Sequence, residues 1–492
     1  MISLDNAIVY DTESFPNIWT IQIEALNNDT RGVFEISEYR DDRAALRQWL
    51  NWLNDGQVPM IGYNSEGYDY PILHHLWMNP NASYADLYAK SKSMIGSDDR
   101  FGHTIWPRDR LAPQIDLYKV HHLDNRAKAT SLKALQFAMR SKTIVESAVP
   151  FDSVVTADQV DGDLIPYGVH DTAETKKFAL YSMDALNFRV GLVDQFGVEC
   201  LSWNDTKIGE KMLEQRLGED VCYERVPTGG FDYNGAPYTK RQRRQTIRHQ
   251  IALRDIIFPW IQFSNPEFQR IHAFMLAQVL KPDEIGDPDG PIKTKGVFTD
   301  LHADVGGIRF DFGTGGVHAS VENKVFVADQ HWMIRDIDVA ALYPSIAVVN
   351  GLAPAHLGNA FVTEYAKLPV ERAKHAKGTV QNAAFKLAAN GAYGKSNSVY
   401  SFLYDPQFTL QITINGQLML CMLAEWLMTV PTISLIQVNT DGVSYMIRRD
   451  MLEQAQAIEQ RWQSLTRLKL EDAEYTRMWI RDVNNYVAEY AE

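Results

Sequence analysis

The chain has 492 residues, of which 45% are hydrophobic and 22% charged, a balance typical of globular proteins rather than disordered or fibrous ones. Its 62 acidic residues outnumber its 48 basic ones, which excludes a broadly basic surface for nucleic acid, so phosphate contacts would have to be concentrated locally. Three widely separated cysteines form neither a disulfide framework nor a zinc pattern, and we expect a cytoplasmic protein with no leader and no membrane span.

The first predicted element is a strand at residues 7–13 that carries two acids. Period-two alternation puts Asp11 and Glu13 on the same face of this strand. Further along, Tyr167 and Asp171 are four residues apart, which puts them on one face of a predicted helix. A D-x-E pair alone occurs by chance in many proteins, so its value depends on the motifs that accompany it.

Five cations within residues 240–248 stand out in an otherwise acidic chain. They are Lys240, Arg241, Arg243, Arg244 and Arg248. One interpretation is a solvated helix face, and the other is an edge that follows the phosphates of DNA. The Pro/Gly/Asp-rich segment 281–296 that comes next predicts an exposed loop.

Three segments of the C-terminal half supply the parts that two-metal chemistry needs. Asp338 lies at the end of a β-rich run, residues 333–339. Asp441 lies in an Asx-Gly turn between strands predicted at 433–438 and 443–447, at the tip of a hairpin. Between them, a predicted helix presents one continuous stripe made of Asn382, Lys386, Asn390 and Tyr393. Two carboxylates can carry divalent metals, and a cation on a helix can take a triphosphate.

These segments resemble the motifs of family B DNA polymerases, especially the compact bacteriophage kind. Motif A of the family reads D-x-x-S-L-Y-P-S, and residues 338–345 read DVAALYPS. Motif B reads K-x-x-x-N-S-x-Y-G, and residues 386–394 read KLAANGAYG. Motif C reads D-T-D-S, and residues 439–442 read NTDG. The chain keeps the metal-binding Asp441 of motif C and departs from the family at Ala341, Gly391, Asn439 and Gly442.

The resemblance implies roles for the residues of the polymerase site. Asp338 and Asp441 would bind metal ions, while Asn390 and Tyr393 would line the nascent base pair. Tyr343 would be the steric gate that excludes a ribose, and packing in the core is an alternative role that is compatible with it.

The triphosphate of the incoming nucleotide would be bound by Lys386 and Arg372. On one unbroken helix these two residues would lie about 21 Å apart, too far for easy joint contact. If the chain reverses near Gly378, the two become neighbours in an antiparallel helix pair, and the resemblance implies such a pair because the family's fingers are built that way.

Two further segments are carried over from the family. Gly315 and Gly316, within residues 312–318, resemble its Y-x-G-G segment, which contacts the template, and a plain loop is the alternative. Residues 481–486 resemble its K-x-Y segment, which supports the primer terminus. Asn484 replaces the lysine, so Tyr486 is the residue carried over.

The N-terminal part resembles the Exo I, Exo II and Exo III motifs of the DEDDy proofreading exonucleases, in the family's order. Residues 11–13 read DTE, residues 64–69 supply N-x-x-x-Y-D, and residues 167–171 supply Y-x-x-x-D. The resemblance implies that Tyr167 orients the attacking water and that two metal ions are held by Asp11, Glu13, Asp69 and Asp171.

Other residues of this region would bind DNA. The frayed 3′ end would be held by Asn64, Tyr68 and Phe15. Ser131 and Leu132 resemble the family's S-L-x-x-h segment, which binds a single strand, and for Ser131 an ordinary helix N-cap is the alternative. We interpret Asp116 as structural, since the metal set is already complete.

We expect a mixed α/β (α+β) protein, and the length predicts roughly three compact units of about 150 residues each. The resemblance implies a ribonuclease-H-like exonuclease domain at 1–180 and a connecting, mostly helical region at 181–330. A palm at 331–360 and 398–492 would be interrupted by short helical fingers at 361–397. No thumb is expected after Tyr486, so either the sequence is a fragment or a second polypeptide supplies the thumb.

The leading hypothesis is a DNA polymerase that extends a primer with dNTPs on a template and proofreads in the 3′→5′ direction, with a second polypeptide supplying the thumb. One rival is a chain that acts only as an exonuclease when isolated, and the other is a non-catalytic DNA-binding subunit of a replication complex. The expected ligands are primer–template DNA, dNTPs and two Mg²⁺ ions per active site, with Mn²⁺ as the alternative metal. Other replication proteins would be further partners, and a phage protein would act in the cytoplasm of its bacterial host.

Overall fold

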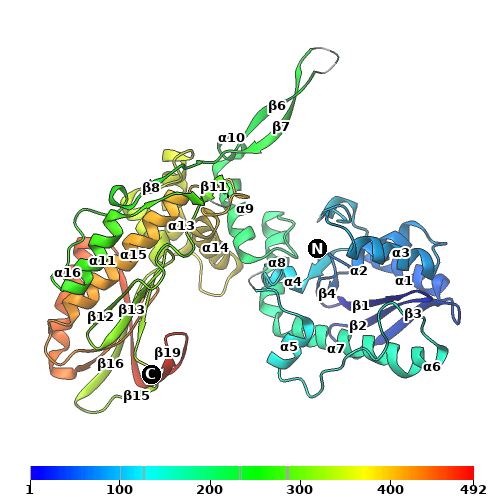
Figure 1. Ribbon diagram of the computed structural model, residues 1–492. Helices are drawn as coiled ribbons and strands as arrows, with labels where there is room; N and C mark the ends of the chain where they lie inside the picture. Colours follow the sequence, from blue (N-terminus) through cyan, green and yellow to red (C-terminus); the bar gives the residue numbers. More distant parts are fainter. Residues whose placement is uncertain are drawn as a thin grey trace. The chain divides into compact units, whose positions relative to one another are not determined.

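The computed structural model describes residues 2–99, 101–125, 128–231, 233, 235–283 and 287–491, the side chains of 287–289 excepted. It divides into two compact units, Met1–Ile208 and Gly209–Glu492, whose elements are labelled in Figure 1. The length had predicted roughly three units. The prediction was wrong because one sheet of the second unit draws strands from residues 302 to 490 into a single layer.

The first unit is built on a five-stranded sheet in the order β3-β2-β1-β4-β5. Strands β1 (Ile8–Phe15), β2 (Ile18–Ala25) and β3 (Arg31–Ser37) form an antiparallel meander. Strands β4 (Met60–Gly62) and β5 (Gln114–Asp116) continue the sheet parallel to β1. This order and mixture of directions is that of the ribonuclease-H-like fold, as the resemblance predicted.

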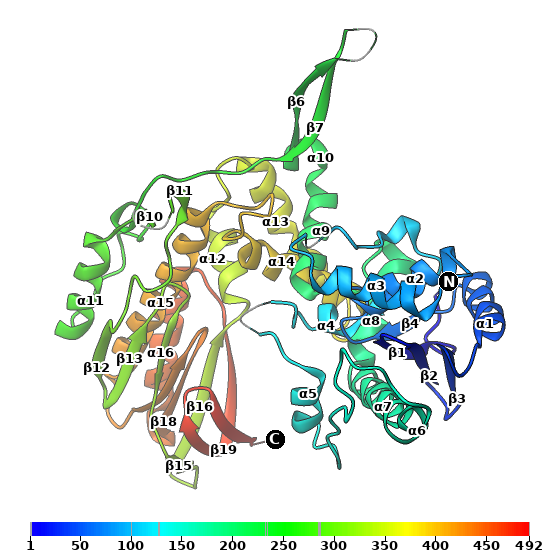
Figure 2. The same ribbon diagram turned by 45° about the vertical axis from the view of Figure 1, so that its right-hand side comes forward.

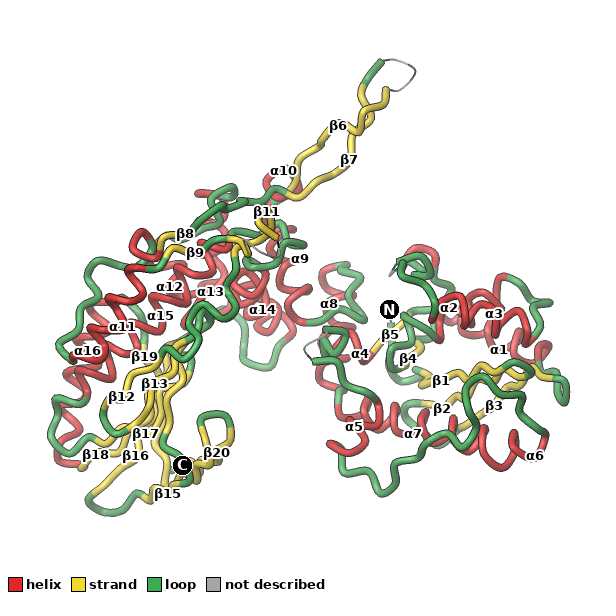
Figure 3. Tube along the Cα trace, in the orientation of Figure 1, coloured by secondary structure: helices red, strands yellow, loops and turns green. Residues whose placement is uncertain are grey.

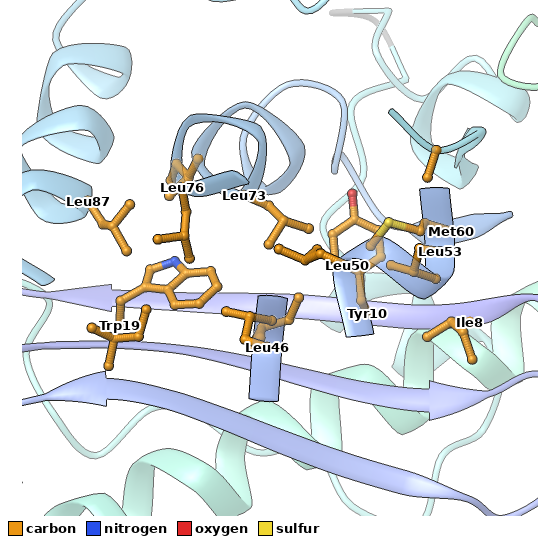
Figure 4. Packing of buried hydrophobic residues seen from close by; sticks show 14 of the residues in the cluster. Ile8, Tyr10, Trp19, Leu46, Leu50, Leu53, Met60, Leu73, Leu76 and Leu87 are labelled. Atoms are coloured by element: carbon orange, nitrogen blue, oxygen red, sulfur yellow. The ribbon is translucent and has the colours of Figure 1, made fainter. Parts of the chain in front are cut away.

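Helices cover both faces of this sheet, so β1 and β2 are mostly buried. On one face lie α1 (Arg43–Gly56), α2 (Asp69–Met78) and α3 (Tyr84–Ile95), whose leucines pack over Tyr10 and Trp19 (Figure 4). The leucines are Leu46, Leu50, Leu53, Leu73, Leu76 and Leu87. On the face of Val9, α7 (Ile165–Tyr181) and α8 (Met183–Phe196) close a separate cluster. The shorter helices are α4 (Leu117–Val120), α5 (Leu132–Ala138) and α6 (Ala157–Gln159).

The second unit is built on an antiparallel sheet in the order β12-β13-β14-β17-β18-β16-β19-β15, with β20 paired to β19. Its strands are β12 (His302–Val305), β13 (Ile308–Phe312), β14 (Val317–Ser320), β15 (Lys324–Val327), β16 (Trp332–Val339), β17 (Ser434–Asn439), β18 (Gly442–Arg448), β19 (Leu470–Asp482) and β20 (Asn485–Tyr490). One face is covered by α11 (Pro266–Ala277), α15 (Pro406–Leu427) and α16 (Leu452–Thr466) (Figure 2). Most residues of α15 are buried, because this helix is enclosed by the sheet and by other helices.

Three helices lie between β16 and β17 in the chain and precede α15. Helix α12 (Leu342–Asn350) follows β16 directly. Helices α13 (Gly358–Arg372) and α14 (Val380–Lys395) pack against each other as a pair. The chain reverses between them at Gly378, whose φ of +88° is easy for glycine and strained for other residues.

Residues 181–330, expected to be mostly helical, contain many short strands as well. The helices of this region are α8, α9 (Asp205–Leu217), α10 (Glu219–Cys222) and α11. Its strands are β6 (Tyr223–Phe231), β7 (Pro237–Arg243), β8 (Ile251–Ala252), β9 (Val279–Leu280), β10 (Pro282–Asp283), β11 (Asp287–Ile292) and those from β12 onward. Figure 3 shows β6 and β7 as an extended two-stranded ribbon. At β6 and β7 the prediction was wrong because an exposed ribbon has no buried face, so its sequence lacks the apolar alternation by which strands are recognised.

Two further expectations concern particular segments. Residues 284–286 of the predicted loop 281–296 lie outside the described residues, and β10 and β11 flank them. None of the described helices is long and apolar enough to cross a membrane.

Candidate active sites: two acidic clusters

The first cluster lies where β1 and α7 meet. Asp11 and Glu13 occupy alternate positions of β1, on the face that α7 covers. Asp69 is the first residue of α2, and its Oδ1 accepts hydrogen bonds from the Thr12 backbone N–H (3.2 Å) and the Thr12 hydroxyl (2.5 Å). The strand that carries two of the acids therefore also fixes the third.

Asp171 completes this cluster from α7. Its Oδ1 accepts a hydrogen bond from Gln136 Nε2 of α5 at 3.1 Å, and His170 Nδ1 lies 3.3 Å from the same oxygen. Helix α7 can lie this close to the sheet because Gly168 has no side chain. A Cβ there would come within 2.6 Å of the Gln22 side chain on β2.

The four carboxylates act on one another electrostatically. Burial raises the pKa of Asp11 well above its usual range, and the charges of Asp69, Glu13 and Asp171 raise it further. Burial also raises the pKa of Glu13, again with help from Asp171 and Asp69, whereas Lys133 lowers it. The structure thus brings together all four acids that the sequence motifs pointed to.

The donor atoms fit a divalent cation in kind and in charge. Carboxylate oxygens are the ligands that Mg²⁺ prefers, and a cation would relieve the mutual repulsion of these buried acids. Gln136 Oε1 is a buried oxygen without a hydrogen-bond partner next to this cluster. In the described part of the chain, however, no three His, Cys, Asp or Glu side chains are arranged to hold a metal as they stand.

Tyr167, expected to orient the attacking water, lies one helical turn before Asp171 on α7. Burial raises the pKa of its hydroxyl, and the charges of Asp171 and Glu13 add to this effect. Lys133 Nζ lies 5.3 Å from the centre of the Tyr167 ring. A role for Lys133 was not predicted from the sequence, although this residue lies only two positions after the predicted Ser131.

Of the three residues expected to hold a 3′ end, Tyr68 is near this cluster. The Tyr68 hydroxyl is 2.6 Å from Ser91 Oγ, and burial raises its pKa to about 12, with smaller contributions from Asp69, Glu13 and Asp11. Asn64 is exposed, has a φ of +59°, and lines a cleft of about 1080 Å³ in the first unit.

Phe15 does not support the expected role. Its side chain is only 3% exposed and packs in an apolar cluster with Ile18, Val155 and Leu164. The prediction was wrong because position 15 extends the alternation of β1 into the core beyond the acids, so its ring cannot stack on a base without leaving that core.

Ser131 is the N-cap of α5 and accepts a hydrogen bond from the Ala134 backbone N–H at 3.2 Å. The alternative interpretation, a helix cap, is therefore present, and the exposed Ser131 and half-buried Leu132 remain predicted contacts for a strand. Asp116 is buried and accepts backbone N–H bonds from Asn64 (2.8 Å) and Glu66 (3.2 Å). Asp116 thus shapes the turn at residues 64–66, in keeping with a structural role.

The second cluster lies across the β16–β18 pair of the second unit. Asp338 is paired in register with Gly442, and Asp441 precedes that glycine in the turn from β17 to β18. The Val339 backbone N–H donates to the Asp441 carbonyl at 2.8 Å. A Cβ at position 442 would lie 1.8 Å from Asp338 Oδ1, so glycine makes room for this carboxylate. The departure from the family at Gly442 therefore has a steric reason.

The Asp338 side chain is exposed, yet partial desolvation raises its pKa to about 7, and the charges of Asp336, Asp441 and Glu471 contribute. Asp441 is exposed as well, and partial desolvation likewise raises its pKa. Asp336 and Glu471 were not assigned from sequence. The alternation in Asp336-Ile337-Asp338 could have revealed the first of them, whereas Glu471 is opposite Asp338 only through the long-range β16–β19 pairing.

Asn439, another departure from the family, ties the turn to its surroundings. Its Oδ1 lies 3.0 Å from His318 Nδ1 on β14, and its Nδ2 donates to the Val483 carbonyl at 3.3 Å. An amide can both accept and donate in this way, which a carboxylate cannot. Burial raises the pKa of the Tyr486 hydroxyl on β20, and the charges of Asp336, Asp338 and Asp441 raise it further. Tyr486 therefore lies near the same cluster.

Two tyrosines join three distant segments beside the second cluster. The rings of Tyr343 on α12 and Tyr393 on α14 are stacked, with centroids 4.2 Å apart. The Tyr343 hydroxyl donates to the Gly315 carbonyl at 3.0 Å, and Gly313 N–H donates to the Gly316 carbonyl, which closes the glycine loop. The predicted gate residue and the predicted glycine loop are thus in direct contact.

On α14, Lys386 and Asn390 are exposed, as a nucleotide-binding role requires. Asn382, the first residue of the predicted stripe, is instead buried. Its Nδ2 donates to the Arg372 carbonyl at 3.2 Å, and its Oδ1 accepts from Arg372 Nε at 3.3 Å. Asn382 therefore joins α13 to α14 and holds Arg372 at their junction, where the reversal at Gly378 was expected to bring it.

No protein-family model matches the sequence, and no curated protein matches it. Among solved structures, the chain is similar to the family B DNA polymerase from the hyperthermophilic archaeon Pyrobaculum calidifontis, with a TM-score of 0.48 and 14% sequence identity. The alignment covers 99% of this chain and 59% of that chain, so this chain spans about 59% of the length of that polymerase. At this TM-score the likeness supports no assignment of function, which rests on the residues described above.

Proposed function

We propose that this chain is a DNA polymerase that extends a primer on a template and uses its first unit to remove nucleotides from the 3′ end. The observation that carries the proposal is the meeting of Asp338 and Asp441 across one β pair, with Gly442 leaving room for a carboxylate. Tyr486 and the stacked Tyr343 and Tyr393 surround that pair from other segments of the chain.

In synthesis, Asp338 and Asp441 would hold divalent cations, which stabilise the attacking and leaving oxygens of a phosphoryl transfer when bound. The exposed ammonium of Lys386 binds the triphosphate, and Arg372 adds a second positive charge from the neighbouring helix. Because the Gly315 carbonyl fixes the Tyr343 hydroxyl, the Tyr343 ring has a set orientation against the sugar of the incoming nucleotide. Asn390 and Tyr393 line the new base pair, and Tyr486 supports the primer end.

In editing, the cations would be held by Asp11, Glu13, Asp69 and Asp171. Tyr167 orients the water that attacks the terminal phosphodiester, since its hydroxyl faces the charge of Asp171. Tyr68 and Asn64 hold the last nucleotide in place. Each unit would therefore carry one activity.

Primer extension tests this assignment. The full chain is incubated with Mg²⁺ and a labelled primer–template, with and without dNTPs. We expect lengthening with dNTPs and shortening without them. Asp338→Ala with Asp441→Ala should abolish lengthening and leave shortening intact, whereas Asp11→Ala with Asp69→Ala should do the reverse. Lengthening that survives the first double substitution would show that the second cluster is not the synthetic site.

One rival activity has specific support. The four acids of the first cluster lie within one compact unit, so an exonuclease can be complete there without the second unit. Shortening under both conditions would favour this rival, and it would direct the search to a second chain. Lengthening by the chain alone would make the expected second chain unnecessary.

A further inference from the structure

The ribbon formed by β6 and β7 belongs to neither acidic cluster. It spans residues 223–243 and extends away from α10 in the second unit (Figure 1). Every described side chain of β7 is exposed, and most of those of β6 are exposed as well. The sequence of the ribbon has four basic and two acidic residues, in a chain whose net charge is −14. Such a local reversal of charge points to an anionic ligand.

The strand register gathers arginines on one face of the ribbon. Arg225 is paired with Arg241, and Tyr223 is paired with Arg243. Residues that are directly opposite, or two apart in one strand, share a face. Successive positions on this face are about 6.7 Å apart along each strand. Arg225, Arg241 and Arg243 therefore form a row on this face, whereas Lys240, which is paired with Val226, lies on the other face.

Arg241 serves to anchor the ribbon. Its guanidinium is 2.9 Å from Glu214 and 3.1 Å from Glu219, and it lies 3.5 Å from the centre of the Tyr223 ring. These contacts neutralise its charge and fix the base of the ribbon to α9 and α10. By contrast, Arg225, Lys240 and Arg243 make no hydrogen bond or ion pair through their side chains within the described residues. Three positive charges are thus available to a ligand.

Aromatic rings are exposed toward the far end of the ribbon. Phe231 is 67% exposed and Tyr238 is 56% exposed. The Tyr238 ring lies against Gly230, where a Cβ would be 3.0 Å from it. The ring thus lies beside the backbone while more than half of the side chain stays exposed, so it can serve as a platform on which a base stacks.

We propose that the ribbon binds single-stranded DNA that crosses its edge, with phosphates at Arg225 and Arg243 on one face and at Lys240 on the other, and with unpaired bases stacked on Phe231 and Tyr238. A single strand is favoured over a duplex because the bases of a duplex are already stacked and cannot reach exposed rings. The proposal shares with the proposed function only the premise that DNA is the ligand, and it does not depend on catalysis in either unit.

Equilibrium binding without metal tests the ribbon separately from catalysis. Fluorescence anisotropy of a labelled 20-nucleotide oligo(dT) and of a 20-base-pair duplex is measured with the full chain in EDTA across a range of KCl concentrations. For the single strand, each lost phosphate contact reduces the magnitude of the negative slope of log K against log salt by about 0.7, so Arg225→Ala, Lys240→Ala and Arg243→Ala together should reduce it by about 2. Phe231→Ala with Tyr238→Ala should weaken oligo(dT) binding by about 5- to 150-fold for each stacked base lost.

The control removes the same charge from exposed positions outside the ribbon. Arg47→Ala, Arg254→Ala and Lys324→Ala together should leave the salt slope for oligo(dT) unchanged. Equal slopes for the ribbon variant and this control would overturn the proposal, as would a loss confined to the duplex. Since Arg241 is retained, thermal unfolding should be unaltered in the ribbon variants, and the two ring substitutions provide an independent second test.

The two proposals can fail separately. The Asp338→Ala, Asp441→Ala variant should bind oligo(dT) as the unaltered chain does, because EDTA removes any contribution of bound metal. Loss of extension with ribbon binding intact would count against the proposed function alone. Intact primer extension together with equal oligo(dT) salt slopes for the ribbon variant and its control would count against the ribbon proposal alone.

Discussion

Gly442 lies opposite Asp338 in the β16–β18 pair, where a Cβ would meet Asp338 Oδ1 at 1.8 Å and the Ile337 carbonyl at 3.1 Å. We expect Gly442→Ala to leave the unfolding temperature nearly unchanged, because the end of the Asp338 side chain can rotate away. The displaced carboxylate should lower the rate of single-nucleotide incorporation by about 100-fold, the cost of misplacing a catalytic group by about 1 Å. Rapid-quench measurement of one incorporation step, at saturating dNTP, gives this rate.

The control for that substitution is Gly162→Ala in the first unit, where no atom lies within 4 Å of the added Cβ. Its incorporation rate should equal that of the unaltered chain. Degradation of a single strand should be unaffected in both variants. An unchanged incorporation rate in Gly442→Ala would mean that the position of the Asp338 carboxylate is immaterial to synthesis.

In the first cluster, Thr12 is the residue that positions a carboxylate, because it hydrogen-bonds to Asp69. Thr12→Val keeps the shape of the side chain and the backbone N–H bond to Asp69, but it removes the hydroxyl that donates at 2.5 Å. A hydrogen bond to a charged group contributes about 1.5–3 kcal/mol, so we expect the rate of 3′-end removal to fall at least about 10-fold. Degradation of a labelled single strand with enzyme in excess measures it. The same swap at Thr466, which is buried in α16, should leave the rate unchanged.

At the scale of elements, α14 and α9 can approach each other closely because glycines lie where the two helices cross. A Cβ at Gly209 would lie 2.1 Å from the Leu387 carbonyl oxygen, and a Cβ at Gly391 would lie 3.1 Å from Gly209 Cα. Because the atoms in the way belong to the backbone, Gly209→Ala should push α14 aside at a cost of about 1–3 kcal/mol in the free energy of unfolding. We expect a lower unfolding temperature, measured by calorimetry, and a higher KM for dNTP, because Lys386 moves with α14.

Gly416→Ala is the control for this helix crossing. A Cβ at Gly416 in α15 meets only the ends of the Ile346 and Leu342 side chains, at 3.2 Å or more, and these can adjust. Its KM for dNTP should therefore match that of the unaltered chain. If Gly209→Ala also left KM unchanged, the position of Lys386 would not depend on this crossing.

Features of the fold and of the site could be predicted from the sequence where they depend on residues close together in the chain. The acids of β1, the hairpin around Asp441 and the reversal at Gly378 were all predictable, because alternation, turn chemistry and helix length act over a few residues. The register that brings Glu471 opposite Asp338 was not predictable, since β16 and β19 are more than 100 residues apart in the chain. The predicted DNA-binding role of Phe15 was wrong for a related reason, because the residues that bury it, Val155 and Leu164, come from a distant segment.

At the scale of the whole molecule, each compact unit carries one cluster of acids, and both clusters should depend on a divalent cation. A ligand that binds only the folded state stabilises it by about 2.7 kcal/mol at 100 times its Kd. We therefore expect Mg²⁺ to raise the unfolding temperature of the first unit and EDTA to abolish both lengthening and shortening. Scanning calorimetry at several Mg²⁺ concentrations measures the first effect without relying on activity.

The Asp11→Ala, Asp69→Ala variant separates site binding from general ionic effects. Its unfolding temperature should be nearly independent of Mg²⁺, because half of the carboxylates of the first cluster are gone. KCl at matched ionic strength should give no comparable rise in the unaltered chain. An equal Mg²⁺ effect in this variant and in the unaltered chain would contradict binding at the first cluster.

The strand order of the second unit has a consequence for how the protein is made. Strand β16 is synthesised early but pairs with β18 and β19, which leave the ribosome more than 100 and more than 130 residues later. Helix α15 is made in between, and almost all of its surface is buried in the finished protein. Until β19 emerges, the nascent chain must expose this helix and the open edges of its sheet. Chaperones that cover apolar surface should therefore engage it during translation of residues 406–482, after the first unit has folded.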